Sequence, residues 1–479
     1  MEKALQAWRR AGAAAHLGLP AALTAILAFR AGGFFPDVTG AAAAGMALLL
    51  VALVTLAAEP GGGWTRLLVT AAAALAGFAV WVLMSFAWSD SPGRALTEFD
   101  RPLLYLLVLV LVGTRAARPG ALGTVLRWTA GAIVVVCLAA LATRLLPMTF
   151  PATANYRNDR LSFPITYWNA LGVLAAIGAV LCTHLSASEA ESPLVRAAAA
   201  GALPIVATTL YLTFSRGGIA AAVLALAVYG VLARPRPIVS VAFTALPATA
   251  LALWAAYHAE LLARADYTTE AAASQGEKLA LVVLACAAAA VILRAVALRA
   301  DRRLLRIRLA QRPRAPVLVA LTALVLLGGA GAAVAAKLPQ RLDDARRSFI
   351  EGDTLPKSAD LRDRLTQVGN NGRIVGWRVA ADSFKAQPWK GTGAGTFRLA
   401  WERDRRPPVF KINDAHSLYL EVLGELGLIG LTLLLVTFGA LLLAGLRGLR
   451  GPERHAHAAF VAAGLALLVH AGVDWDWEM

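Results

Sequence analysis

The chain has 479 residues, of which 58% are hydrophobic and 16% charged, with a formal net charge of +16 and a mean hydropathy of +0.62. A soluble domain carries about 25% charged residues, so this composition excludes an ordinary soluble protein. The apolar residues fall in repeated blocks of about 20, each long enough to cross a hydrocarbon layer of about 30 Å as a helix. The sequence therefore predicts an all-α polytopic membrane protein with about 12–14 transmembrane helices.

The apolar blocks define about thirteen spans by this length criterion. In chain order their approximate limits are 17–35, 38–58, 66–88, 100–114, 121–146, 166–186, 194–213, 217–233, 237–258, 278–298, 315–336, 417–446 and 455–473. Lys and Arg near the span ends number about 21 on one side and about 9 on the other, the longest loop excluded, which predicts a cytoplasmic N-terminus. The odd count predicts an outer C-terminus, unless one span is counted twice or the natural chain continues past Met479.

One polar segment, residues 337–415, is too long to be a simple connection. It holds sixteen Lys or Arg and lies on the extracytoplasmic side of the predicted topology. Within it, residues 373–387 have apolar side chains at helical spacing, and Pro388 ends the run. We therefore divide the chain into N-terminal transmembrane helices (1–336), a long extracytoplasmic loop with short helices (337–415) and C-terminal transmembrane helices (416–479).

The basic residues do not indicate nucleic-acid binding, because most are dispersed through the loops between apolar blocks. The cysteines Cys137, Cys182 and Cys286 all lie inside apolar blocks, without CxxC spacing or a nearby histidine cluster. They are interpreted as small buried side chains, so no disulfide framework, metal site or cofactor is expected.

The first polar motif is TFSRGG, residues 213–218, between two apolar spans. An arginine at this depth is costly unless it has an anionic partner or reaches the interface. Ser215 and Arg216 are therefore candidate ligand contacts, and the two following glycines allow close approach of the backbone. The alternative is a plain turn whose arginine extends to the interface.

The second motif is NGR (371–373), which leads into the expected helix and is followed by GTGAGTF (391–397). No strand–turn–helix pattern surrounds these glycines, so a dinucleotide site is not indicated. Free backbone N–H groups around Gly393, close to Arg373, can still bind phosphate oxygens. A flexible surface loop is the alternative.

The third motif is NDAHS (413–417), which opens a long apolar span. His416 lies where the chain re-enters the membrane, and a histidine with a pKa near neutrality can exchange protons. Glu421 and Glu425, four residues apart, share one face of the same span. Because ionisable groups inside a membrane span usually have a function, both are candidate functional residues. Helix capping and interface anchoring are the alternatives.

Together these motifs resemble one family, the O-antigen ligase and O-antigen polymerase superfamily of bacterial inner-membrane glycosyltransferases. The resemblance rests on TFSRGG (213–218), on NGR…W…P…GTGAGTF (371–397) and on AHSLYLEVLGELGLIG (415–430). Weaker similarities are FAWSDSPGRAL (86–96) and YWNALG (167–172), which contains Asn169. The order of the motifs, and the long loop just before the histidine-bearing span, are as in the family.

The resemblance implies a GT-C-type fold and a metal-independent transfer at the outer face of the cytoplasmic membrane. The donor it implies is a glycan on undecaprenyl pyrophosphate, and the acceptor a lipid or a glycan. By motif, Arg216 and Arg373 would neutralise the pyrophosphate leaving group, and His416 would act at the bond being transferred. The further substrate-binding residues proposed are Arg378, Ser215, Gly393, Glu425 and Asn169.

Two questions stay open at this point. A ligase, which passes on a finished glycan, and a polymerase, which joins repeat units, use the same donor chemistry. A transporter of the same lipid-linked sugars is the main alternative, although no internal repeat is evident and the polar candidates gather at one face. A purely structural membrane scaffold would leave the basic loop unexplained.

Overall fold

The computed structural model describes residues 16–56, 63–115, 118–151, 160–234, 237–264, 267–306, 338–351, 360–366, 369–404 and 412–479. Over these residues the chain is helical, and the only extended pairing is an isolated bridge between Arg264 and Asp360. The expected all-α class is confirmed for the described part of the chain.

The helices run in chain order as α2 (Leu19–Ala28), α3 (Pro36–Leu56), α4 (Arg66–Met84), α5 (Pro92–Gly113), α6 (Ala121–Leu145), α7 (Trp168–Ala187), α8 (Pro193–Leu212), α9 (Arg216–Ala233), α10 (Ile238–His258), α11 (Glu270–Arg306), α13 (Leu338–Glu351), α14 (Asp363–Thr366), α15 (Arg373–Ala386), α16 (Phe397–Asp404), α17 (Leu418–Gly448) and α18 (Arg454–Ala471). Among the described residues, nine helices are long and apolar enough to cross a membrane. They are α3, α4, α6, α7, α8, α9, α10, α11 and α17.

Four of the expected thirteen spans are not among these nine. The block at 17–35 forms only the ten-residue α2, which ends at Ala28. The block at 100–114 is the second half of α5, whose first half carries Arg94, Glu98, Asp100 and Arg101. The block at 455–473 is α18, in which three histidines lower the hydropathy. The block at 315–336 lies outside the described residues.

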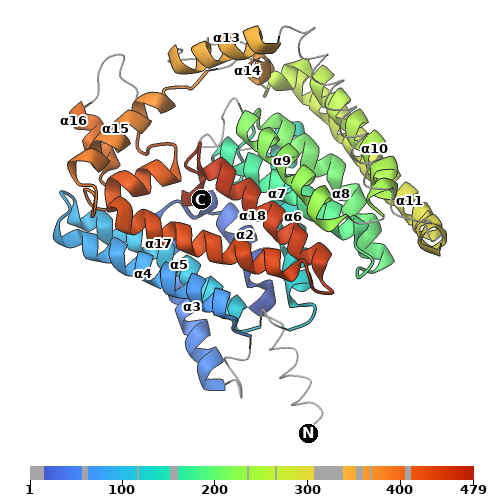
Figure 1. Cartoon of the computed structure of the whole chain (residues 1–479). Helices are drawn as coiled ribbons and strands as arrows, with labels where there is room; N and C mark the ends of the chain where they lie inside the picture. The colour runs from blue at the N-terminus through green and yellow to red at the C-terminus, as the bar shows by residue number, and fades with distance from the viewer. Residues whose placement is uncertain are drawn as a thin grey trace.

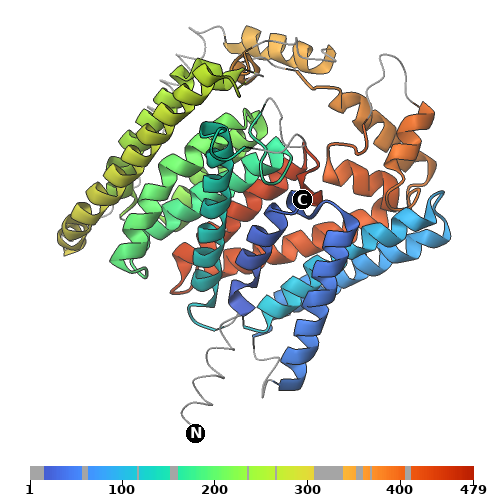
Figure 2. The same ribbon diagram turned by 180° about the vertical axis from the view of Figure 1, so that it is seen from behind.

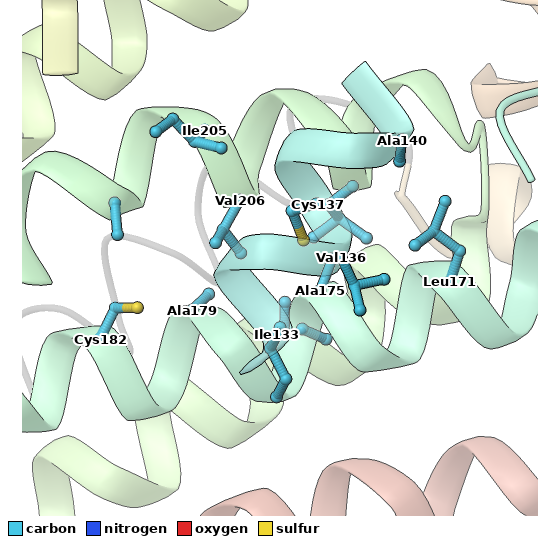
Figure 3. Close-up of a cluster of buried hydrophobic side chains, with 14 of the residues drawn as sticks. Ile133, Val136, Cys137, Ala140, Leu171, Ala175, Ala179, Cys182, Ile205 and Val206 are labelled. Atoms are coloured by element: carbon cyan, nitrogen blue, oxygen red, sulfur yellow. The ribbon is translucent and has the colours of Figure 1, made fainter. Parts of the chain in front are cut away.

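The long helices form one bundle, with α10 and α11 along an outer edge and α4 beside α17 (Figures 1 and 2). At its centre, α7 packs against α8 and α9, and α18 lies against α9. Figure 3 shows the core between α6 and α7, where Ile133, Val136 and Cys137 face Leu171 and Ala175. Small side chains on α7 let neighbouring helices approach closely, which is typical of membrane bundles.

The helices α13 to α16 lie at one end of this bundle (Figure 1), and α15 and α16 contact α17. The helix expected at 373–387 is confirmed as α15, which ends at Ala386 before Pro388. Its Val379 and Ala380 pack with Phe397, Trp401 and Ala415 in a separate small apolar cluster. This part of the polar segment is therefore ordered by its own core.

Candidate functional site

Three chain segments that are distant in the sequence meet at one carboxylate, Asp474, which follows α18. Its Oδ1 accepts hydrogen bonds from Tyr167 Oη (2.5 Å) and from the Trp475 N–H (2.9 Å). Its Oδ2 accepts from Asn169 Nδ2 (2.6 Å) and forms an ion pair with Arg373 Nη2 (2.6 Å). We call Tyr167, Asn169, Arg373 and Asp474 the Asp474 cluster. It joins the start of α7 to the start of α15.

Asp474 is only 2% exposed, yet it remains a carboxylate. Burial by itself would raise its pKa, but the positive charges of Arg373, His416 and His470 outweigh that effect and hold the pKa below its ordinary value. Because four donors already point at its two oxygens, Asp474 is a poor proton acceptor. Its role in the cluster is to hold the groups around it.

Arg373 uses only one edge of its guanidinium on Asp474. Nη2 makes the ion pair, whereas Nη1 has no hydrogen-bond partner among the described residues. The residue is the first of α15, and Asn371, two positions earlier, has a φ of 53°. The remaining edge of a fixed, permanently charged fork is suited to the oxygens of a phosphate.

Arg216 opens α9 directly after its N-cap, Ser215. The Ser215 hydroxyl accepts from the Gly218 N–H at 3.1 Å, so this side chain is a helix cap in the structure. Arg216 Nη2 donates to the Gly369 carbonyl at 3.2 Å, and its charge acts on that of Arg373. The turn therefore places Arg216 in electrostatic range of the Asp474 cluster.

Gly217 and Gly218, which follow Arg216, allow close packing between helices. A Cβ on Gly218 would lie 3.0 Å from the Gly172 carbonyl carbon of α7, and one on Gly217 would lie 2.9 Å from His470 Nε2 of α18. The sequence suggested that these two glycines allow a ligand to approach the backbone, and the structure offers close helix packing as another reason for them. They let α7, α9 and α18 converge behind Arg216.

His416 lies just before α17, with 27% of its side chain exposed. Its Nδ1 is 2.7 Å from Asp414 Oδ1, and its Nε2 has no hydrogen-bond partner within the described residues. Burial opposes the charged imidazole, but the Asp414 carboxylate prevails and raises the pKa of His416 above its ordinary value. The ring lies 6.5 Å from that of Trp475, beside Asp474.

Arg160 belongs to the same region, although no sequence motif points to it. Its Nε donates to the Thr213 carbonyl (2.7 Å) and its Nη2 to Asn169 Oδ1 (3.2 Å). Burial, followed by the like charges of Arg364 and Arg373, lowers the pKa of Arg160 to about 9. The region thus concentrates cationic side chains around one fixed carboxylate.

Residues with a strained backbone conformation also lie close to the Asp474 cluster and His416. Six described non-glycine residues have a positive φ. Four of them lie within two positions of site residues, namely Thr166 (77°), Phe214 (47°), Asn371 (53°) and His416 (50°). Such conformations persist only where the surroundings enforce them, and they concentrate at functional sites.

The glycine segment of the second motif is engaged elsewhere. Gly393 N–H donates to the Glu425 carbonyl (2.8 Å), while the Glu425 carboxylate accepts from the N–H groups of Gly395 (2.8 Å) and Phe397 (2.7 Å). Ala394 N–H donates to Ser85 Oγ at 3.0 Å. These amides therefore bind within the protein, and the expected bed of free N–H groups is not present in this arrangement.

Glu425 and Gly393 thus form a structural contact rather than part of the Asp474 cluster. α17 is interrupted at Gly427 (φ 65°, ψ −165°), where a Cβ would lie 2.4 Å from the Trp389 carbonyl carbon. The glycine segment is docked on this break. Arg378 lies exposed on α15, and Glu421 Oε2 accepts from the Ala415 N–H at 2.7 Å.

The main residues that sequence reasoning missed are Asp474 and the His470–Asp476 pair. Nδ1 of His470 lies 2.9 Å from Asp476 Oδ1. The available signal was the acidic and aromatic ending DWDWE, residues 474–478, after a span that ends in a histidine.

Residues 201–435 match a family model described as O-Antigen ligase. The matched region contains Arg216, Arg373 and His416. No curated protein matches the chain.

Proposed function

We propose, from the match of residues 201–435 to the O-antigen ligase family model, that the chain is a member of this family and transfers a glycan from an undecaprenyl-pyrophosphate carrier to a lipid or glycan acceptor. The reaction takes place at the outer face of the bacterial cytoplasmic membrane, in a GT-C-type fold. The N-terminus is cytoplasmic, and segment 337–415, between the membrane helices of 1–336 and those of 416–479, is extracytoplasmic. The observation that carries this proposal is the half-used guanidinium of Arg373, fixed by Asp474.

Displacement of a pyrophosphate builds negative charge on its oxygens, and preorganised cationic donors stabilise that charge. The open edge of Arg373 and the nearby charge of Arg216 supply such donors. Neither needs a metal ion to act. Asn169 and Asp474 hold Arg373 in place, and the exposed Arg378 is a candidate contact for the glycan or a lipid head group.

His416 is the proposed base. The acceptor hydroxyl gives its proton to Nε2 of His416 while its oxygen forms a bond to the anomeric carbon of the donor. The bond from that carbon to the phosphate oxygen breaks, and its electron pair leaves with undecaprenyl pyrophosphate. Asp414 orients the ring through Nδ1 and stabilises the imidazolium that forms.

Ser215, Gly393 and Glu425 support this site indirectly in our proposal. Ser215 caps the helix that carries Arg216. Glu425 ties the glycine segment to α17, whose first turn follows His416. A change at these positions should act through the placement of Arg216 or His416.

The test supplies purified protein in vesicles with a lipid-linked oligosaccharide and measures the release of undecaprenyl pyrophosphate. We expect release by the wild type and a loss of about 100-fold or more in Arg216→Ala and Arg373→Ala, the usual effect of removing one preorganised donor. Lys385→Ala, which removes an exposed ammonium paired with Asp382, is the matched control. Normal release by both arginine variants contradicts the pyrophosphate assignment.

The same experiment separates the remaining alternatives. Donor that crosses the vesicle membrane intact identifies a transporter. A single transferred glycan identifies a ligase, whereas a ladder of products identifies a polymerase.

A further inference from the structure

A second histidine–aspartate pair lies beside the Asp474 cluster, and the proposed mechanism leaves it unused. His470, in the last turn of α18, and Asp476 in the 3-10 turn η6 (Asp476–Glu478) have side chains that are 1% and 0% exposed. Nδ1 of the ring lies 2.9 Å from Oδ1 of the carboxylate. Such complete burial of an ionisable pair is costly unless the charges are matched.

The surroundings of Asp476 indicate that the imidazole is charged. Its carboxylate has His470 as its one hydrogen-bond partner in the described part of the chain, and its Oδ2 is buried without a partner. An imidazolium neutralises this carboxylate, whereas a neutral ring would leave an uncompensated buried charge. With both ring nitrogens protonated, Nε2 is a donor.

α18 packs against α9 (Figure 1), and Nε2 of His470 lies beside the first turn of α9. It lies 2.9 Å from the position that a Cβ on Gly217 would take, one residue after Arg216. Neither this nitrogen nor the Gly217 N–H has a hydrogen-bond partner within the described ranges. The Nε2 of a ring that is 1% exposed thus lies at the N-terminus of an 18-residue helix that begins with Arg216, and a helix N-terminus and a charged imidazole each favour an anion.

We propose that His470 is an anion-binding residue of the site, whose Nε2–H donates to a phosphoryl oxygen held at the first turn of α9. The ligand is the pyrophosphate of the lipid-linked donor, so the assignment rests on the proposed function. Asp476 is the positioning residue that fixes the ring and its charge. His470 and His416 then have separate tasks, one at the leaving group and one at the acceptor hydroxyl.

The experiment measures two quantities for the full-length protein in nanodiscs: the affinity for inorganic pyrophosphate and for undecaprenyl pyrophosphate, and the rate of glycan transfer. His470→Gln removes the charged donor, and Gly217→Ala puts a methyl group against Nε2. We expect both to weaken pyrophosphate binding about tenfold, as the loss of one charge-assisted hydrogen bond does. Asp476→Asn should weaken it too, and His258→Gln, on an exposed histidine of α10, should not.

The alternative is that His470 only links α18 to α9 and binds no anion. In that case His470→Gln would lower the melting temperature and leave the pyrophosphate affinity within about twofold of wild type, and this result overturns the assignment. If the wild type transfers glycan and His470→Gln binds pyrophosphate normally, the role of His470 alone is wrong. If the wild type transfers nothing but shows His470-dependent pyrophosphate binding, glycosyl transfer is wrong and the anion site stands.

Discussion

Arg373 and Asp474 lie 101 positions apart and form an ion pair of 2.6 Å with side chains 18% and 3% exposed. The pair connects the first residue of α15 to the chain beyond α18, and Asn169 and Tyr167 of the α7 start complete it. Because Asp474 fixes one edge of the guanidinium, the other edge is held in a single orientation. The ion pair thus converts a flexible arginine into a preorganised one.

Removal of one partner of this pair should destabilise the protein strongly. Asp474→Ala leaves a largely buried guanidinium without its counter-ion, and such a change costs about 3–5 kcal/mol in the free energy of unfolding. Arg373→Ala should have a similar cost. In the double variant the two costs should not add, because no uncompensated charge remains. Unfolding in detergent, followed by temperature or denaturant, measures these values.

Activity should separate from stability in the same set of variants. The double variant is expected to recover stability and to remain inactive, since the group proposed to bind the pyrophosphate is absent. Asp474→Asn keeps the size of the side chain and should retain part of the activity. Full activity in the double variant would show that the pair is purely structural.

The pH dependence of transfer should report on His416. Its pKa lies above the ordinary 6.5 because Asp414 outweighs burial, with Asp474 acting in the same direction and Arg373 against it. A base must be neutral, so kcat/KM should rise with pH through a value above 6.5. Asp414→Asn removes the main opposite charge and should move this limb to lower pH. A profile unchanged by that substitution would exclude His416 as the titrating base.

The raised pKa of His416 also affects the stability of the protein, but its contribution is largest at low pH, where the activity is lowest. A folded-state pKa above the unfolded value stabilises the native protein at low pH, and this contribution disappears as pH rises through the folded pKa. The Asp414→Asn protein should therefore lose stability relative to wild type mainly below pH 6.5, the ordinary pKa of histidine. Thermal unfolding at pH 5.5 and pH 8.5 tests this.

The sequence predicted much of the architecture because local patterns determine it. Apolar length predicted the helices that fit a membrane, and helical spacing with Pro388 predicted α15. The predicted limits of the spans were wrong where charged residues adjoin an apolar block, as at Arg94 to Arg101 in α5. They also failed at α2, where ten residues are too few to span a membrane.

The site was only partly predictable, since its connections are long-range. Arg373 and Asn169 were identified as separate motifs, and nothing local shows that both bind Asp474. Arg160 lies before α7, and no sequence motif marks it. Gly393 and Glu425 remain predictions as substrate contacts, because glycines at this spacing can serve phosphate binding or backbone packing, and the structure shows a packing contact between them. Only the three-dimensional partner decides between the two.

The glycine segment should behave as a structural contact. Gly393 has a φ of 104°, and a Cβ there would lie 2.4 Å from the Ser89 Cβ, so Gly393→Ala should destabilise the protein by about 1–3 kcal/mol. Glu425→Gln replaces an acceptor of two N–H groups by an amide and should cost a similar amount. Neither should change inorganic pyrophosphate affinity at a temperature where the variant is folded. A selective loss of that affinity would restore the phosphate-binding role of this segment.

The predicted topology can be tested with single cysteines, because the three native cysteines are buried and should react slowly. Lys385, at the end of α15, has a side chain that is 73% exposed, and Arg450, between α17 and α18, is exposed as well. The excess of basic residues around Arg450 predicts a cytoplasmic position for it, and the polar segment is predicted to lie outside. A membrane-impermeant maleimide should therefore label Lys385→Cys in intact cells and Arg450→Cys only after lysis. The reverse pattern would invert the orientation and place the Asp474 cluster on the cytoplasmic side, where a carrier presenting its glycan outside could not reach it.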